Sequence, residues 1–335
     1  MNTLPQLPTI GEPSTFEQGD RIRELLRRFQ AQSKGAMGVY RGFTEICPPR
    51  LRVNTYFGCA FQCKFCYAWY HGGRSTARPE RRVLKNLPED IDLAISLGIS
   101  HLPVMVSCSC DPLQPLEQTH RCTLRVLELL SESQFPIIVI TQNPRVLLEE
   151  RYLLALRSTK STLEVTIPSM NAGLGGTGIF ESSAPPALER FDAMKSLATQ
   201  GVTVRLRIDP VIPRLDEHGP GQSHDDIREL VRLAVASGAS LVISKPMRLA
   251  AEILPQIMCS LLPYYGDHRS EPPSSVVPVD LDQRTQKQLL DPVWNACRES
   301  SIRFCPCVSN VTFDETVPCW QADGIIGNSR SSGRT

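Results

Sequence analysis

Short apolar runs alternate with longer amphipathic stretches along most of the chain. The runs are rich in β-branched residues and predict six strands, at residues 51–57, 102–106, 136–141, 162–167, 202–208 and 240–244. Stretches with a helical period lie between them, at residues 88–97, 116–131, 145–156, 186–199 and 225–236. Such alternation is typical of parallel strands joined by right-handed crossovers. We therefore expect an α/β fold, a six-unit (β/α) partial TIM-like barrel with a C-terminal extension.

The pattern is weaker at both ends, and this predicts three parts of the chain. Residues 1–45 are expected to form a polar, Pro-rich tail and a helix. Residues 46–245 are expected to form the partial barrel. Residues 246–335 include a Pro-rich segment and one more predicted helix at 281–298, and they are expected to form an extension that covers the barrel.

Composition and charge indicate a globular protein that stays in the cytoplasm. The chain has 335 residues, 41% of them hydrophobic, and a formal net charge of +1, which gives no general attraction for polyanions. No apolar run is long enough to predict a membrane span, and the N-terminal segment lacks the features of a signal peptide. In such a chain, twelve cysteines indicate metal binding or catalysis rather than a disulfide scaffold.

Three of these cysteines, Cys59, Cys63 and Cys66, are spaced four and three residues apart directly after the first predicted strand. In barrel enzymes the loops at the carboxyl ends of the strands carry the chemistry. A structural zinc site needs four ligands, usually in two separated pairs, whereas thiolates at short spacing hold iron–sulfur clusters. Three thiolates would leave one iron of a four-iron cluster open to a small chelating ligand. The alternatives are a zinc loop or incidental thiols.

The C-x3-C-x2-C spacing, with the aromatic Phe65 before the last cysteine, resembles the signature of the radical S-adenosylmethionine superfamily. The resemblance implies a [4Fe-4S] cluster on Cys59, Cys63 and Cys66, with S-adenosyl-L-methionine chelating the open iron. It also implies cleavage of that cofactor to a 5'-deoxyadenosyl radical, which abstracts hydrogen from the substrate. A protein electron donor such as flavodoxin or ferredoxin would be needed as a partner.

Further blocks of the chain resemble the spore photoproduct lyase-like branch of that superfamily, at residues 107–121, 140–147, 181–190 and 205–217. The resemblance implies a hydrogen-donating cysteine at Cys108, although Cys110 stands directly before Asp111 here and leaves open which thiol acts. It implies an aromatic residue that relays hydrogen at Tyr67. Either cysteine could instead be a small buried residue at a strand end, as free cysteines commonly are.

Seven polar residues are candidates for cofactor binding, together with Phe65; they lie along or after the predicted strands, except Glu181, which precedes a predicted helix. They are Gln142, Asn143, Thr166, Ser169, Glu181, Arg205 and Arg207. Gln142 stands where the resembling lyases carry a lysine, so an amide would replace a charged contact. Each also has a structural alternative: an ordinary turn, a hydroxyl that satisfies loop backbone, a surface carboxylate, or an arginine paired with an acid inside the barrel.

A second cysteine group lies near the end of the chain, at Cys305, Cys307 and Cys319. It is a possible second metal site, although no fourth ligand is evident, and packing of the terminal segment is the alternative.

The substrate class follows from what the chain lacks. Repair of duplex DNA calls for phosphate-neutralising Lys and Arg beside wedge or stacking aromatics, and the basic stretches at 21–28 and 78–85 offer little of that. We therefore expect a nucleoside-like or other small metabolite, in which a carbon bond is made or rearranged, as in tunicamycin-type nucleoside antibiotic biosynthesis. Repair of a thymine photoproduct in DNA and a non-catalytic metal-binding protein remain the alternatives.

Overall fold

The computed structural model describes residues 15–40, 50–66, 68, 76–217, 219–249, 261–268, 280–307, 311–316 and 319. Over these ranges the main sheet has eight strands, in the order β1-β2-β5-β6-β7-β8-β9-β10. The strands are β1 Met37–Tyr40, β2 Arg50–Val53, β5 Val104–Val106, β6 Ile137–Thr141, β7 Ser161–Thr166, β8 Thr203–Val211, β9 Leu241–Pro246 and β10 Arg303–Pro306. β1 pairs antiparallel with β2, and every other neighbouring pair is parallel.

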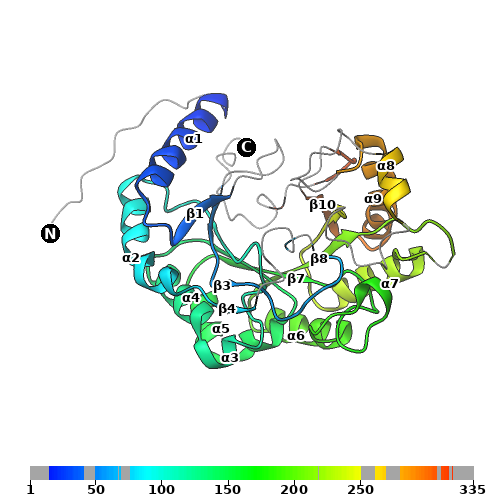
Figure 1. Cartoon of the computed structure of the whole chain (residues 1–335), viewed down its shortest axis with the longest axis horizontal. Helices are drawn as coiled ribbons and strands as arrows, with labels where there is room; N and C mark the ends of the chain where they lie inside the picture. Colours follow the sequence, from blue (N-terminus) through cyan, green and yellow to red (C-terminus); the bar gives the residue numbers. More distant parts are fainter. Residues whose placement is uncertain are drawn as a thin grey trace, which may run out of the picture.

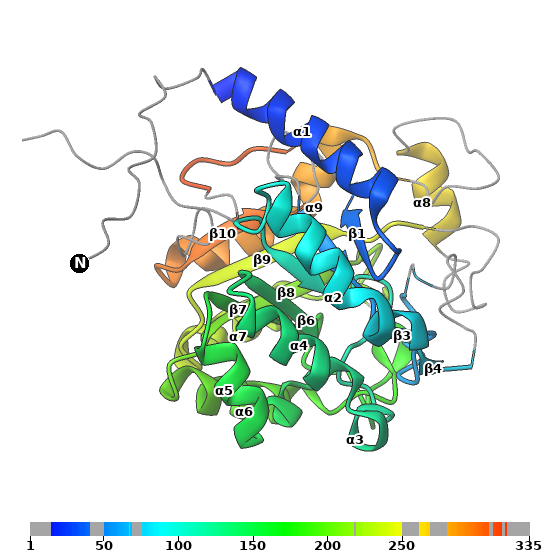
Figure 2. The same ribbon diagram turned by 90° about the vertical axis from the view of Figure 1, so that its left-hand side faces the viewer.

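Helices connect the strands and cover the outside of the sheet. They are α1 Thr15–Gln32, α2 Arg81–Ser96, α3 Glu117–His120, α4 Cys122–Glu132, α5 Glu150–Arg157, α6 Ala187–Thr199, α7 His224–Ala236, α8 Leu262–Asp267 and α9 Gln283–Glu299. The larger helices follow one curved outer layer (Figure 1), and α2, α4, α5 and α6 lie in front of the strands in Figure 2. A small ribbon of β3 Tyr56–Phe57 and β4 Arg78–Pro79 lies beside the sheet.

The predicted α/β fold with a mostly parallel sheet is confirmed, and all six predicted strands are present as β2 and β5 to β9. The count of six units is not confirmed, because β10 adds a seventh parallel strand beside β9. Helix α9 precedes β10 and packs against both β9 and β10. The C-terminal segment therefore contributes to the sheet itself. The division of the chain at residues 45 and 245 stays a prediction, and residues 1–14 of the expected tail lie outside the described ranges.

Alternation along the strands separates an apolar outer face from a charged inner face. On β7, Leu163 and Val165 belong to the main hydrophobic core, while Glu164 between them is buried on the other side. On β8, Leu206 packs into the same core and Arg205 faces Glu164. Because side chains alternate with a period of two, the outer residues pack under the helices and the inner ones line the interior of the curved sheet.

Helix starts follow the capping chemistry of the sequence. Ser223 precedes α7 and its hydroxyl accepts a hydrogen bond from the Asp226 N–H at 3.1 Å. Asp282 precedes α9 and accepts from the Thr285 N–H at 2.9 Å. These side chains satisfy backbone donors that a helix start leaves without partners. No helix in the described part of the chain is both long and apolar enough to span a bilayer.

Candidate active site

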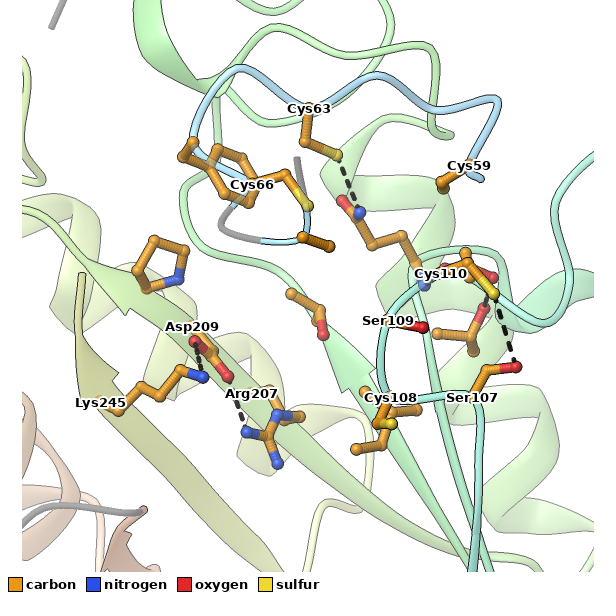
Figure 3. Close-up of a pocket in the computed structure, with 18 of the residues that line it drawn as sticks. Cys59, Cys63, Cys66, Ser107, Cys108, Ser109, Cys110, Arg207, Asp209 and Lys245 are labelled. Carbon is orange, nitrogen blue, oxygen red and sulfur yellow. Dashed lines mark hydrogen bonds and ion pairs between the residues drawn. The ribbon is translucent and has the colours of Figure 1, made fainter. Parts of the chain in front are cut away.

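A pocket lies at the carboxyl ends of the parallel strands and extends into the interior of the sheet (Figure 3). Its lining comes from the loop after β3 and from the ends of β5, β6, β7, β8 and β9. The predicted site residues that line it are Cys59, Cys63, Phe65, Cys66, Cys108, Cys110, Gln142, Thr166 and Arg207. Residues distant in sequence therefore meet where a parallel sheet places its chemistry.

The loop with the three cysteines is held by the side-chain amide of Gln114 and by packing against apolar side chains. Gln114 accepts a hydrogen bond from the Ala60 N–H at 2.9 Å and donates to the Gly58 carbonyl at 3.2 Å. The cysteines pack with the buried Phe61 and Ala184. Phe65 packs against the ring of Phe180, with 6.2 Å between ring centroids. The loop thus has a defined course without any disulfide.

The three thiols fit an iron–sulfur cluster by their chemistry. Burial raises the pKa of Cys59 and of Cys66 to about 12, and it raises the pKa of Cys63 as well. Within the described ranges, no three Cys, His, Asp or Glu side chains gather closely enough to hold a single metal ion. In a four-iron cluster each thiolate binds its own iron, so three thiols around one pocket match that requirement better than they match one ion.

Cys63 belongs to a hydrogen-bond network behind the loop. Gln142 donates from Nε2 to the Cys63 Sγ at 3.0 Å, and Arg190 donates from Nη1 to the Gln142 Oε1 at 3.1 Å. Asp111 accepts from the Thr141 hydroxyl at 2.7 Å and from the Gln142 N–H at 2.6 Å. Burial raises the pKa of Asp111 to about 6, against the lowering effect of these hydrogen bonds. The network orients the Gln142 amide towards the thiol.

Cys108 and Cys110 both line the pocket but make different contacts. The Cys108 thiol is half-buried, donates to the Asn54 Oδ1 at 3.5 Å and accepts from the Arg52 Nη1 at 3.6 Å. Cys110 donates to the Tyr56 carbonyl at 3.1 Å, and burial raises its pKa to about 12. In Figure 3 Cys110 lies near Cys59, whereas Cys108 lies deeper beside the strands. The two thiols therefore lie in different parts of the pocket.

The opposite wall carries charges that pair with one another. Arg207 contacts Glu164 at 2.5 Å and Asp209 at 2.6 Å, and Lys245 lies 3.7 Å from the second Asp209 oxygen. Arg205 is fully buried, pairs with Glu164 at 3.3 Å and does not line the pocket. Burial raises the pKa values of Glu164 and Asp209, but the neighbouring cations outweigh it and hold both below their usual range.

The remaining predicted cofactor residues are engaged with the protein itself. Ser169 accepts from the Asn171 N–H at 3.1 Å, and the Asn143 side chain donates to a backbone carbonyl at 2.9 Å. Glu181 is exposed and pairs with Lys64 at 2.6 Å. Ser169, Asn143 and Glu181 do not line the pocket, and Thr166 does. Tyr67 lies outside the described residues.

The C-terminal cysteines lie at the base of the charged wall. Cys305, Cys307 and Cys319 are buried together against Leu241 and Ile243. The Arg207 Nη2 donates to the Cys307 Sγ at 3.6 Å, and a hydrogen bond from Cys305 lowers the pKa of Cys319 to about 6. In the described part of the chain these thiols form no metal-binding group, so a second metal site has no support there.

Four residues that shape the site were not singled out from the sequence: Asp111, Gln114, Arg190 and Lys245. The strand alternation could have found Lys245, since it follows Ile243 by two residues on β9 and so shares its inner face. Asp111 and Gln114 follow Cys110 on the same loop. Nothing in the local pattern marks Arg190, whose partner Gln142 lies 48 residues away.

Comparisons with known proteins agree with this fold. No protein-family model matches the chain. An uncharacterized protein of Methanocaldococcus jannaschii is 28% identical over 177 residues, which are 51% of this chain and 64% of that protein.

Among solved structures, a spore photoproduct lyase variant with bound AdoMet and dinucleoside spore photoproduct aligns with a TM-score of 0.58 and 13% identity, over 88% of this chain and 85% of the lyase. Streptococcus suis SuiB bound to precursor peptide SuiA aligns with a TM-score of 0.51 and 12% identity, over 90% of this chain and 57% of SuiB. The chain therefore shares the fold of spore photoproduct lyase.

Proposed function

We propose that this chain is a radical S-adenosylmethionine enzyme of the spore photoproduct lyase-like branch, with a [4Fe-4S] cluster on Cys59, Cys63 and Cys66. One observation carries the proposal. The three closely spaced cysteines line a pocket at the carboxyl ends of a parallel sheet, together with Cys108 and Gln142 from other strands. The fold shared with spore photoproduct lyase supports the same assignment.

The residues of the pocket have separate tasks in this proposal. When bound, the cluster and S-adenosylmethionine supply a carbon radical that removes a hydrogen atom from the substrate. Phe65 shields the loop by packing on Phe180, and Gln142 orients Cys63 through its hydrogen bond. Cys108 holds a hydrogen atom on Sγ that can quench a radical within contact distance. An external electron donor such as flavodoxin or ferredoxin completes the requirements.

The substrate in this proposal is a nucleoside-like or other small metabolite in which a carbon bond is made or rearranged. The charged wall offers Arg207, Asp209 and Lys245 as donors and acceptors for polar substrate groups. Met105 and Met247 line the same pocket and offer apolar contact. A pocket with apolar lining and a few convergent polar groups is typical of small-molecule sites.

Anaerobic reconstitution tests the cluster assignment. The wild-type protein should bind about four iron atoms per chain, as expected for one cubane on cysteine thiolates, and should form 5'-deoxyadenosine with dithionite and S-adenosylmethionine. A variant with Cys59, Cys63 and Cys66 replaced by Ala should lose both properties. Cys122→Ala is the matched control, because this buried cysteine on α4 lies away from the pocket. Iron and deoxyadenosine retained by the triple variant would overturn the assignment.

Repair of a thymine photoproduct is the second candidate function. It is favoured by the fold shared with the lyase bound to dinucleoside spore photoproduct. If phosphate contacts dominated binding, affinity for ultraviolet-damaged oligonucleotide would fall on the order of a thousandfold over a fourfold rise in salt, for six or more contacts. We expect no such binding. Tight, salt-dependent association together with restoration of thymines would replace the small-metabolite proposal.

A further inference from the structure

Arg190 on α6 is a fully buried cation directly behind the cysteine loop, with 0% of its surface exposed. Its Nε donates to the Pro185 carbonyl at 2.7 Å, and its Nη1 donates to the Thr166 carbonyl at 2.7 Å and to the Gln142 Oε1 at 3.1 Å. The Nη2 atom has no hydrogen-bond partner among the described residues. All three acceptors are neutral, so the hydrogen bonds do not balance the charge.

A buried guanidinium without an ion pair is costly, because it loses hydration and gains no opposite charge in exchange. Two groups near Arg190 can carry a negative charge, Cys63 and Asp111, and both interact with it electrostatically. Asp111 forms no ion pair with Arg190 among the described residues, because its oxygens accept hydrogen bonds from Thr141 and Gln142. Cys63 is connected to Arg190 through the single amide of Gln142. A thiolate at Cys63, as in a bound cluster, would therefore complement the buried cation.

The loop of residues 171–178, which contains four glycines, packs against the other side of this guanidinium. Gly173 has φ +109°, and a Cβ added there would lie 2.4 Å from the Pro185 carbonyl oxygen and 2.9 Å from the Arg190 Nη2. Any side chain would collide with the backbone and with the guanidinium. The backbone of Gly173 is itself held by hydrogen bonds to Phe180 and Ser182. The loop thus keeps Arg190 packed away from solvent, where its field is least screened.

We propose that Arg190 is a positioning and charge-compensating residue for the cluster, acting on Cys63 through Gln142 and through its buried positive charge. The inference rests on the proposed function, because it requires the cluster. Hydrogen bonds to cluster sulfurs and a nearby positive charge both favour the state with one more electron, and they raise the reduction potential. Arg190 makes the cluster easier to reduce by the single electron that an external donor supplies.

The test measures the reduction potential without S-adenosylmethionine and without turnover. Wild-type protein and variants are reconstituted anaerobically, iron per chain is counted, and the reduced cluster is followed by electron paramagnetic resonance during titration with dithionite and mediators. Arg190→Met should bind the cluster but show a tenfold lower ratio of reduced to oxidised cluster at a fixed potential, which corresponds to about 59 mV for a one-electron couple. Arg190→Lys should restore most of the loss.

Two further variants keep the test decisive. Gln142→Leu removes the bridging amide and keeps the positive charge of Arg190, which loses one of its three acceptors, and it should lower the potential in the same direction even if Arg190→Met does not fold. Lys195→Met removes an exposed cation from the same helix and should leave the potential unchanged. Full clusters with wild-type potentials in Arg190→Met and Gln142→Leu would overturn this inference alone. A wild-type protein that binds no cluster would overturn the proposed function, and this inference with it.

Discussion

The two walls of the pocket differ in how their polar groups are buried: one buries charges in ion pairs, and the other buries neutral thiols. The thiol wall consists of Cys59, Cys63, Cys66 and Cys110, and the charged wall consists of Arg207, Asp209 and Lys245, with the buried Glu164 paired to Arg207 behind it. On the charged wall, cations and carboxylates lie within ion-pair distance, and the carboxylate pKa values are held low. On the thiol wall, burial raises the pKa of every cysteine.

The difference shows which wall has its charges compensated by the protein alone. The charged wall supplies its own counter-charges, so its parts stabilise one another and losing one leaves buried charges with less compensation. The thiol wall has neutral thiols around a pocket and one buried cation, Arg190, behind them. Asp111 is a carboxylate near that cation, and thiolates formed on binding a metal centre would add further negative charge beside it. The charged wall should therefore dominate stability, and the thiol wall should dominate chemistry.

The largest effect on stability should come from Glu164→Gln. The carboxylate is buried between Arg205 and Arg207, and the amide cannot neutralise either guanidinium. Breaking a buried ion pair in this way costs about 3–5 kcal/mol of unfolding free energy. Urea unfolding followed by circular dichroism measures the change. Glu229→Gln is the control, because its pair with Arg232 is exposed on α7 and should leave the midpoint unchanged. Equal midpoints for Glu164→Gln and wild type would show that the charged wall is not self-compensating.

Protonation of Asp111, beside the thiol wall, should have a smaller effect on stability and should raise it. Its pKa is raised to about 6, above the unfolded value, so its contribution to stability is present at low pH and is lost as pH rises through 6. Lowering the pH from 7 to 5 should therefore stabilise the fold through this group by about 1 kcal/mol. The depressed pKa values of Glu164 and Asp209 act only at lower pH, because their stabilisation is lost as pH falls below about 4.

The comparison that isolates Asp111 is the pH dependence of Asp111→Asn. The amide does not titrate, so the gain in stability between pH 7 and pH 5 should shrink by about 1 kcal/mol relative to wild type. Chemical unfolding at several pH values, with the wild-type curve subtracted, gives the difference directly. An identical pH profile in both proteins would place the Asp111 pKa outside this window and remove the proposed contrast between the walls.

The sequence predicted the framework and brought out the three cysteines that line the pocket, because both are local patterns. The six strands follow from apolar runs, and Cys59, Cys63 and Cys66 follow from spacing within eight residues. β10 was not predicted, because residues 303–306 form a short strand with cysteine and proline instead of a β-branched run. Its place in the sheet is fixed by pairing with β9.

Residues that act through distant contacts could not be predicted in the same way. Arg190 resembles any arginine on a helix until α6 packs against the segment Pro144–Leu148 after β6 and brings it to Gln142. Ser169, after a predicted strand, and Glu181, before a predicted helix, were candidates for cofactor binding, yet Ser169 accepts from the Asn171 N–H and Glu181 pairs with Lys64. Whether a polar residue at a strand end faces the pocket depends on the loop that follows, and a single sequence does not show its course.

Cys110→Ala should have a modest effect on stability and little on chemistry. Its thiol is half-buried and contacts the Tyr56 carbonyl at 3.1 Å and the Ser107 hydroxyl at 3.8 Å, so the substitution loses a small apolar volume and weak hydrogen bonding. The expected cost is about 1 kcal/mol of unfolding free energy. Cleavage of S-adenosylmethionine and the distribution of products should stay close to wild type. A changed product distribution here would move the hydrogen-donor role from Cys108 to Cys110.

The smallest effect on stability should accompany the most specific effect on the reaction, in Cys108→Ala. This thiol is half-buried and makes long hydrogen-bond contacts with Asn54 and Arg52, at 3.5 and 3.6 Å, so its loss should change the unfolding midpoint less than that of Cys110→Ala. A thiol within contact of a product radical can quench it by transferring a hydrogen atom. The variant should therefore still cleave S-adenosylmethionine but divert the product radical into side products.

In heavy water, where thiol hydrogens exchange, wild-type product should carry deuterium at the quenched carbon. An unchanged product distribution in the variant, with no solvent deuterium in the wild-type product, would leave Cys108 as a packed residue at a strand end.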